Sequence, residues 1–394
     1  MEFMTVKEAA EKWNVSTRLI QRYCSNGRIT GARKSGNVWE IPCDAIKPED
    51  PRRKEGNNIY RNSSFQNLMP LMNTSFQPGE CKKIISKMKE GARKDIAYAE
   101  YYYFRGNPQM SAQMAKQYLT CSNTELRLSA CLIYAFSNLS IGQIEQARQV
   151  LEKIKSTLKE DKERAQQIKV IDAFIAMAAA VLLHLPLPED IPSMQEFIPI
   201  LPFGLRSFAL YVEAHYLYLQ KNYEKSIGMI EAALAMGANQ YPIPAIYLHL
   251  AAVMDYMSLK QLEKAENHLL IAWELARPDD LIEGFGEHHG LLGGMLEAVI
   301  KPKWPEDFKR IISITYEFSA GWRKIHNPVT GHEVADDLST TEFAVAMLAA
   351  RGWTNSEIAK HLNISSNTVK NHISQAIKKL HVENRKALKQ YMLK

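Results

Sequence analysis

The sequence predicts a mainly α-helical protein, in which an α-solenoid of helical hairpins lies between a small N-terminal winged helix and a C-terminal four-helix helix-turn-helix domain. Three observations lead to this prediction. Each end of the chain carries helix-start motifs separated by a tight turn. Nearly everything from about 93 to 325 has the apolar periodicity of amphipathic helices. Within that stretch, similar junctions between helices recur at a spacing near 40 residues, which is typical of helical repeats.

Length and composition indicate a soluble protein of several domains. The 394 residues are 46% apolar and 23% charged, enough for two to four globular domains. The longest apolar run, 173–183, is too short to cross a bilayer, and the first residues lack the apolar core of a signal peptide. The 5 cysteines include no C-x-x-C pair, which fits free thiols in a reducing compartment. We therefore expect a cytoplasmic protein with no membrane contact.

The charge distribution suggests that both ends meet an anionic partner. Residues 1–55 contain 11 Lys and Arg against 8 Asp and Glu, and residues 338–394 contain 9 against 3. The remainder is slightly acidic, with 29 against 32. Basic ends around an acidic middle are expected when the ends contact phosphates. The predicted regions are the winged helix 1–55, a partly packed linker 56–90, the helical repeats 91–328 and the C-terminal domain 335–394.

Three helix starts near the C-terminus follow from capping chemistry. The segments 339–342 and 354–357 are capping boxes, each followed by an apolar periodic run. A tight turn at 363–364 then leads to Ser365, the expected cap of a third helix. In the first of these helices one inner face is expected, formed by Phe343, Met347 and Leu348.

The third helix has one apolar and one polar face. Val369, Ile373, Ile377 and Leu380 recur at intervals of three and four residues and should form the buried stripe. The opposite face carries Lys370, Asn371, Ser374, Gln375 and Lys378. Such side chains can donate to phosphates or bond to base edges in a major groove. This pattern predicts a helix-turn-helix, and the alternative is a helical hairpin with a solvated polar face.

The stretch 338–388 resembles the LuxR-type (NarL/FixJ-like) DNA-binding domain, notably in 352–359, 368–372 and 379–382. The resemblance implies that Lys370, Asn371 and Ser374 approach bases, while Thr368 and Lys378 lie near phosphates. It also implies a final helix that contributes a dimer contact through Leu388 and Tyr391.

One residue departs from the LuxR-type pattern. Thr341 stands where the family usually has arginine, which removes a stabilising ion pair. Glu342 keeps its expected capping role.

The N-terminal segment predicts a winged helix. The capping box 5–8 begins a helix with Ala9, Ala10 and Trp13 on its inner side, and Ser16 caps a second helix that ends near Ser25. The run 34–37 has the composition of a hairpin tip. The outward-facing side chains are Thr17, Arg18, Gln21 and Arg22 on the second helix and Arg33 and Lys34 on the wing.

This segment resembles the excisionase/MerR-like winged-helix family in 5–10, 14–16 and 38–42. The resemblance implies either DNA contact or protein docking, since such domains serve in both ways.

The middle of the chain is self-similar at three helix junctions, 139–147, 219–226 and 258–265. Their aligned small residues, Ala147, Ser226 and Ala265, are 79 and 39 residues apart, so one copy is disguised within 186–202. An earlier copy is expected at 106–112. Small residues at these points let paired helices approach closely.

The repeats resemble TPR-like solenoids, and by their length the helical repeats that precede LuxR-type domains in MalT-like regulators. The resemblance implies a concave surface for a small-molecule, peptide or protein effector. The aromatic residues that either pack these helices or line a ligand groove are Tyr101, Tyr102, Tyr103, Tyr211, His215, Tyr216 and Tyr218.

A possible metal cluster consists of Glu283, Glu287, His288 and His289. Its spacing matches no zinc signature, and we interpret these residues as polar surface groups before a glycine-rich turn. We expect no metal and no cofactor.

The leading hypothesis is a homodimeric transcription regulator that binds double-stranded DNA and senses an effector or partner through its repeats. One alternative is a repeat-based protein-interaction adaptor, and another is an excisionase-like DNA-architectural factor. An enzyme is not expected, because the sequence contains no nucleophile elbow, phosphate loop or metal-ligand spacing.

Overall fold

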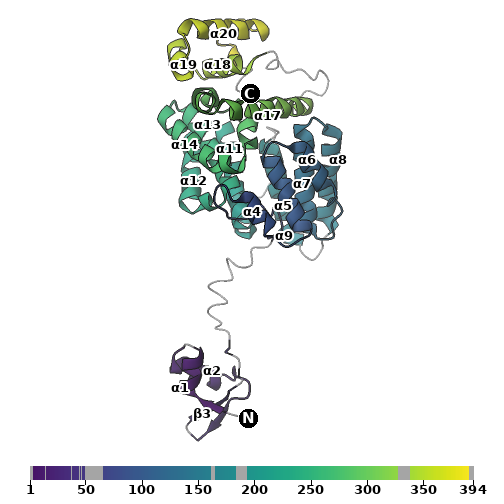
Figure 1. Cartoon of the computed structure of the whole chain (residues 1–394), viewed down its shortest axis with the longest axis vertical. Coiled ribbons are helices and arrows are strands. Elements are labelled where there is room, and N and C mark those ends of the chain that lie inside the picture. The colour runs from purple at the N-terminus through teal and green to yellow at the C-terminus, as the bar shows by residue number, and fades with distance from the viewer. Residues whose placement is uncertain are drawn as a thin grey trace. The chain divides into compact units, whose positions relative to one another are not determined.

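The computed structural model describes residues 3–13, 15–36, 38–43, 45, 47–48, 65–160, 165–182, 193–326 and 338–389. The chain divides into two compact units, Met1–Ser63 and Ser64–Lys394. Figure 1 shows that the second unit is built of helices and that the first combines two short helices with a sheet, so the protein is mainly helical, as the sequence predicts. Within the described ranges, no helix combines the length and apolar composition that a bilayer crossing needs.

The first unit is a small winged helix with its own core. Its elements are β1 (Phe3–Thr5), α1 (Val6–Trp13), α2 (Thr17–Ser25), β2 (Arg33–Ser35) and β3 (Val38–Pro42). The strands form an antiparallel sheet in the order β1-β3-β2. The predicted hairpin is confirmed by the pairing of Ser35 with Val38, across a tip where Gly36 has φ +61°. Strand β1, which the sequence analysis did not predict, pairs with β3 and completes the sheet.

The second unit begins with a segment tied onto the helices. Buried side chains of this segment are Phe65, Leu68, Leu71, Met72 and Phe76. The buried carboxylate of Glu100 accepts hydrogen bonds from the backbone N–H groups of Leu71 at 2.9 Å and Met72 at 3.0 Å. The part of the predicted linker from Phe65 onward is therefore part of the core.

The helices of this unit occupy most of the chain up to residue 326. They are α4 (Cys81–Ser86), α5 (Ala92–Phe104), α6 (Pro108–Lys116), α7 (Thr124–Ser140), α8 (Ile144–Glu160), α9 (Ala165–Leu182), α10 (Met194–Phe197), α11 (Phe203–Leu219), α12 (Tyr223–Ala235), α13 (Pro242–Ser258), α14 (Leu262–Ala276), α15 (Glu283–Glu287), α16 (Lys301–Lys303) and α17 (Pro305–His326). Short helical turns are η1 (Ile198–Ile200), η2 (Ala238–Gln240) and η3 (Arg277–Asp279), and η4 (Leu296–Ile300) is a π-helix.

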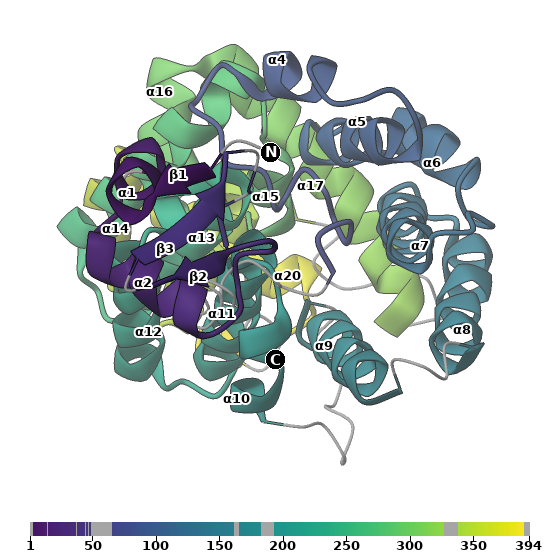
Figure 2. The same ribbon diagram turned by 90° about the horizontal axis from the view of Figure 1, so that it is seen from below.

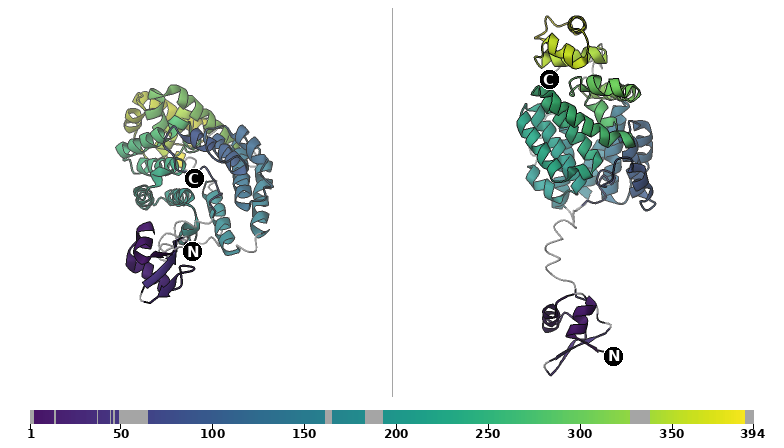
Figure 3. Two further views of the ribbon diagram at one scale, coloured as in Figure 1. Left: turned by 60° about the horizontal axis from the view of Figure 1, so that its bottom comes forward. Right: turned by 60° about the vertical axis from the view of Figure 1, so that its left-hand side comes forward.

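Consecutive helices pack against each other in two groups. Helices α5 to α8 pack in succession, as do α11 to α14, whose ribbons lie side by side in Figure 3. Helix α17 contacts both α7 and α15, and Figure 2 shows it between the two groups. It therefore joins the first group to the end of the second.

The junctions within these groups share one turn geometry. Gly106, Gly142, Lys221 and Lys260 have φ between +58° and +74°, and the N–H that follows each donates to the carbonyl five residues earlier, at 2.8 to 2.9 Å. This hydrogen bond belongs to the Schellman motif that ends a helix. Five residues after each turn residue stands a small side chain with 0% exposure: Ser111, Ala147, Ser226 and Ala265. The three self-similar junctions and the earlier one at 106–112 therefore share one geometry, whereas the disguised copy within 186–202 lies partly outside the described residues.

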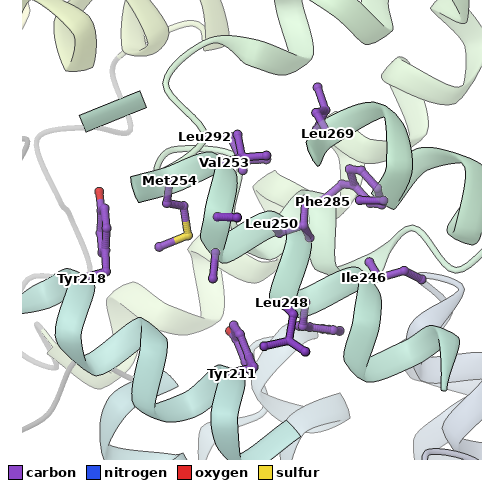
Figure 4. Close-up of a cluster of buried hydrophobic side chains, with 14 of the residues drawn as sticks. Tyr211, Tyr218, Ile246, Leu248, Leu250, Val253, Met254, Leu269, Phe285 and Leu292 are labelled. Atoms are coloured by element: carbon purple, nitrogen blue, oxygen red, sulfur yellow. The ribbon is translucent and has the colours of Figure 1, made fainter. Parts of the chain in front are cut away.

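Helix α13 is the centre of the second group. Every residue from Pro242 to Met257 is buried, which fits a helix that is apolar on all sides. Figure 4 shows side chains of α11, α14 and α15 gathered around α13, among them Tyr211, Leu269 and Phe285. Tyr218 and Leu292 lie at the edge of the same cluster, next to the C-terminal domain.

The C-terminal helices are α18 (Thr340–Ala350), α19 (Asn355–Leu362) and α20 (Ser366–Lys379). Their core belongs to the same hydrophobic cluster as the helices that precede them, since that cluster runs from Phe65 to Leu388. The C-terminal domain is therefore packed onto the preceding helices within one compact unit.

Candidate nucleic-acid interface

All three predicted C-terminal helix starts are confirmed. Ser339 accepts from the N–H of Glu342 at 3.3 Å while the Glu342 carboxylate accepts from the N–H of Ser339 at 2.8 Å. The same reciprocal pair joins Thr354 and Glu357, at 3.2 and 2.6 Å. Ser365 accepts from the N–H at the start of α20 at 3.0 Å.

The turn between α19 and α20 is as tight as the sequence predicts. Asn363 has φ +54°, a left-handed conformation that ends α19 and redirects the chain within two residues. Helices α19 and α20 pack directly against each other. They form a helix-turn-helix, with α20 in the place of the DNA-reading helix.

Helix α20 separates its apolar and polar residues cleanly. The predicted stripe is inside: Val369, Ile373 and Leu380 are buried, and Ile377 is half-buried. The side chains exposed on the other side are Lys370, Asn371, Ser374, Gln375 and Lys378. We call these five residues the reading face. Thr368 is half-buried, and its hydroxyl lies 2.8 Å from that of Ser365.

An ion pair ties α20 to α18 behind the reading face. Lys379 donates to Glu342 at 2.8 Å. Thr341 replaces the arginine that is usual in the family, and the ion pair expected to be lost with that arginine is supplied instead by Lys379. Burial raises the pKa of Glu342, but hydrogen bonds from Lys379 and from Ser339 outweigh it and leave the pKa lowered. Glu342 is therefore held ionised at the junction of the two helices.

Helix α18 differs from the sequence prediction. A single inner face was expected, yet every residue from Ala344 to Ala350 is buried. One side packs on α20, and the other meets the glycine-rich turn 290–294, between α15 and η4. The expectation of one inner face was wrong because this helix is covered from two directions.

The sequence analysis did not identify several residues that hold the C-terminal domain on the helices that precede it. Arg351 donates to the Tyr218 hydroxyl at 2.9 Å and to the Leu291 carbonyl at 2.7 Å. Lys260 lies 3.4 Å from the Glu357 carboxylate. Two features of the sequence pointed to this contact. Helix α18 is apolar on all sides, and the run Gly-Leu-Leu-Gly-Gly at 290–294 leaves space for a close approach.

Of the two residues assigned to a dimer contact, the structure describes only Leu388, which is not exposed. Leu388 has 0% exposure and belongs to the core of the unit. Tyr391 lies outside the described residues. Homodimerisation therefore stays a prediction, and Leu388 contributes to it only if the end of the chain rearranges.

The N-terminal unit also displays its candidate residues. All six are exposed: Thr17, Arg18, Gln21, Arg22, Arg33 and Lys34. Arg33 is engaged within its own sheet, because it pairs with Glu40 at 2.8 Å and lies 4.2 Å over the Phe3 ring. The predicted capping box is confirmed, and hydrogen bonds from the Thr5 N–H and hydroxyl lower the pKa of Glu8.

The possible metal cluster is buried, so the interpretation as surface groups was wrong. Exposures are 1% for Glu283, 3% for His288 and 4% for His289. The four side chains bond to different partners. Glu283 accepts from Ser140 at 3.5 Å through one carboxylate oxygen, Glu287 accepts from Tyr103 and Tyr247, His288 bonds to Tyr211, and His289 bonds to Glu297 at 2.7 Å. No group of three potential metal ligands converges within the described ranges.

The aromatic residues proposed either as packing residues or as a ligand groove are mostly packing residues. Tyr101, Tyr103, Tyr211, His215 and Tyr218 are buried. Tyr102 and Tyr216 are half-buried. Burial raises the pKa of Tyr211 and of its neighbour Tyr247 well above the usual value, so both phenols stay protonated and bond within the core.

Each end of the chain matches a known protein family. Residues 336–392 match the family described as "Bacterial regulatory proteins, luxR family", and residues 1–46 match one described as "Helix-turn-helix domain". The two-component response regulator PprB of Pseudomonas aeruginosa is 42% identical over 62 residues, which span 16% of this chain and 21% of that relative. The chain thus carries a C-terminal luxR-family helix-turn-helix domain and an N-terminal helix-turn-helix domain.

Proposed function

We propose that this protein is a DNA-binding transcription regulator whose C-terminal domain binds promoter DNA through the reading face of α20. The observation that carries the proposal is the exposure of all five reading-face residues although α18 and α19 are packed against the repeats. Lysine, asparagine, serine and glutamine on one helix face provide both phosphate contacts and base-edge hydrogen bonds.

The remaining regions have supporting roles in this proposal. The helical hairpins, with their shared Schellman turns and buried small residues, form a TPR-like repeat domain that senses an effector or partner. Two copies bind paired half-sites as a homodimer. The protein acts without catalysis. The exposed residues of α2 and the wing are a second DNA contact, with protein docking as the alternative for that unit.

The experiment is a salt titration of DNA binding by the full-length chain. Duplexes are first selected by the protein from a random-sequence library, and affinity is then measured by fluorescence anisotropy. We expect Lys370→Ala and Asn371→Ala to weaken binding of the selected duplex by about 10- to 100-fold relative to a scrambled duplex. Lys378→Ala should weaken both duplexes and reduce the slope of log affinity against log salt by about 0.9.

The matched control is Lys309→Ala, which removes the same charge from an exposed site on α17. It should leave both the affinity and the salt slope unchanged. A full-length protein that selects no duplex at low salt would instead support the repeat-based adaptor, and unchanged affinities for all three reading-face variants would exclude the proposed orientation of α20.

A further inference from the structure

The contact between the C-terminal domain and the repeats has a specific construction, which we call the dock. It consists of α18, α19 and Arg351 on one side and of the turn 290–294 with Lys260 on the other. The dock lies behind the reading face, since none of the reading-face residues is buried in it.

Glycines on the repeat side let α18 approach closely. A Cβ atom on Gly290 would stand 2.8 Å from the Phe343 ring, and one on Gly294 would stand 2.9 Å from Leu362. Contacts this short do not occur between real side-chain atoms, so a larger residue would require the facing side chain or the helix that carries it to shift. The run of glycines thus creates the space that the domain fills.

Arg351 reaches from the end of α18 into the repeats, but it is only partly satisfied there. Its Nη2 makes the two bonds to Tyr218 and Leu291, whereas its Nε and Nη1 are buried with no hydrogen-bond partner among the described residues. Buried donors without partners cost free energy that they regain in water. The arginine therefore positions the domain without locking it.

Two further features keep the contact adjustable. Lys260, held at positive φ in the turn before α14, lies 3.3 Å from the Gly352 carbonyl and 5.8 Å from the Trp353 ring, in an exposed setting. A groove of about 420 Å³, open to solvent, runs between the two sides, with Met295 and Val299 on the repeat side. Solvent therefore reaches the edge of the dock.

We propose that the dock sets the position of α20 relative to the repeat domain, and that Arg351 is the positioning residue through which changes in the repeats reach the DNA-reading helix. This inference rests on the proposed function. The docked form is the one that binds paired half-sites, because it holds α20 in a fixed direction with its reading face uncovered. Releasing the dock leaves each reading face intact but removes the fixed spacing between two copies.

The docked state can be detected without DNA. A zero-length carbodiimide coupling converts the Lys260 ammonium and the Glu357 carboxylate into an amide only when the two groups touch, and the cross-linked peptide is identified by mass spectrometry. In the full-length protein we expect this cross-link in wild type, a several-fold lower yield in Arg351→Ala and an intermediate yield in Arg351→Lys. The control Lys264→Ala, one turn further along α14, should leave the yield unchanged.

DNA binding by the same variants tests the function of the dock. We expect Arg351→Ala to weaken binding to a duplex with two half-sites about tenfold, and to a duplex with one half-site less than twofold. The salt slope should not change, because the Arg351 guanidinium is directed into the dock and away from phosphates. Arg351→Lys should partly restore the affinity for two half-sites.

A second pair of variants guards against simple misfolding. Gly290→Ala introduces a methyl group against Phe343 at a backbone position without positive φ, whereas Gly228→Ala adds one where nothing lies within 4 Å. Only the first should reduce the cross-link and the two-half-site affinity.

The outcomes separate this inference from the proposed function. A lost cross-link with unchanged affinity for both duplexes would overturn the positioning role and leave DNA binding intact. A rise in affinity on release would overturn it too, since the dock would then be inhibitory. If wild type cross-links but binds no duplex, the proposed function fails and the positioning role fails with it.

Discussion

The two helix-turn-helix regions of this chain bury their apolar side chains in different ways. The N-terminal unit closes its own core around Ile20, Tyr23 and Ile41, with a sheet of three strands against its two helices. The C-terminal helix-turn-helix contains no sheet within the described residues 338–389, and its first helix is buried on both sides, by α20 and by the helices that precede the domain. A small helix-turn-helix can therefore be either a module with its own core or an extension of the helices that precede it.

The largest expected effect tests whether the C-terminal domain really shares its core. Leu348, with 0% exposure, packs on the side of α18 that meets Gly294. We expect Leu348→Ala to destabilise the second unit by about 3 kcal/mol. Hydrogen exchange in increasing denaturant should show α18 and α13 losing protection together, with 6–42 unaffected.

The matched control is Ile20→Ala, a substitution at an equally buried site in the N-terminal unit. It should lower protection in 6–42 alone. If Leu348→Ala instead lowers protection in α18 to α20 and leaves α13 unchanged, the C-terminal domain is an independent module and the comparison between the two units breaks down.

A smaller effect is expected from the ion pair inside the C-terminal domain. Lys379→Met removes the partner of the partly buried Glu342 and should cost about 1 kcal/mol at pH 7. The pKa of Glu342 is lowered in the folded protein. The stabilisation that ionised Glu342 contributes is therefore fully present above the ordinary pKa of a glutamate, and it is lost as the pH falls through the lowered pKa.

Urea unfolding at pH 7 and at pH 3 checks the sign of this effect. The difference between wild type and Lys379→Met should shrink at the lower pH. Lys378→Met removes the same charge one residue away, on the reading face, and should change the free energy of unfolding by less than about 0.5 kcal/mol. An equal cost for both variants would show that the pairing with Glu342 contributes nothing.

Local motifs account for what the sequence could predict. The capping boxes at Thr5, Ser339 and Thr354, the hairpin tip at Gly36 and the small residues after the helix junctions each involve neighbours within a few positions. Short-range hydrogen bonds and turn conformations of this kind depend on residue identity alone. They predicted the helices at both ends of the chain and the hairpin of the N-terminal unit, but not strand β1.

Long-range contacts account for what was missed. Arg351 and its partner Tyr218 are 133 positions apart, and nothing near either residue specifies the other. Similarly, His288 and His289 read as polar surface residues because their partners, Tyr211 and Glu297, come from other elements. The one available clue was the composition of α18, whose apolar residues on all sides require a second covering surface.

The smallest expected effect concerns the wing of the N-terminal unit. Arg33 pairs with Glu40 at an exposed site and stacks on Phe3, so Arg33→Ala should destabilise this unit by only about 0.5 kcal/mol. Arg33→Lys keeps the charge but loses the planar stacking. It should therefore recover only the ion-pair contribution to the stability of this unit, which is the contribution that 1 M salt screens. Hydrogen exchange in 6–42 measures both variants, with Lys7→Ala on exposed α1 as the control for loss of one positive charge. A cost above about 2 kcal/mol for Arg33→Ala would mean that the N-terminal sheet depends on Arg33 as strongly as the C-terminal domain depends on its buried contacts. The contrast between a self-contained and a shared core would then have no energetic basis.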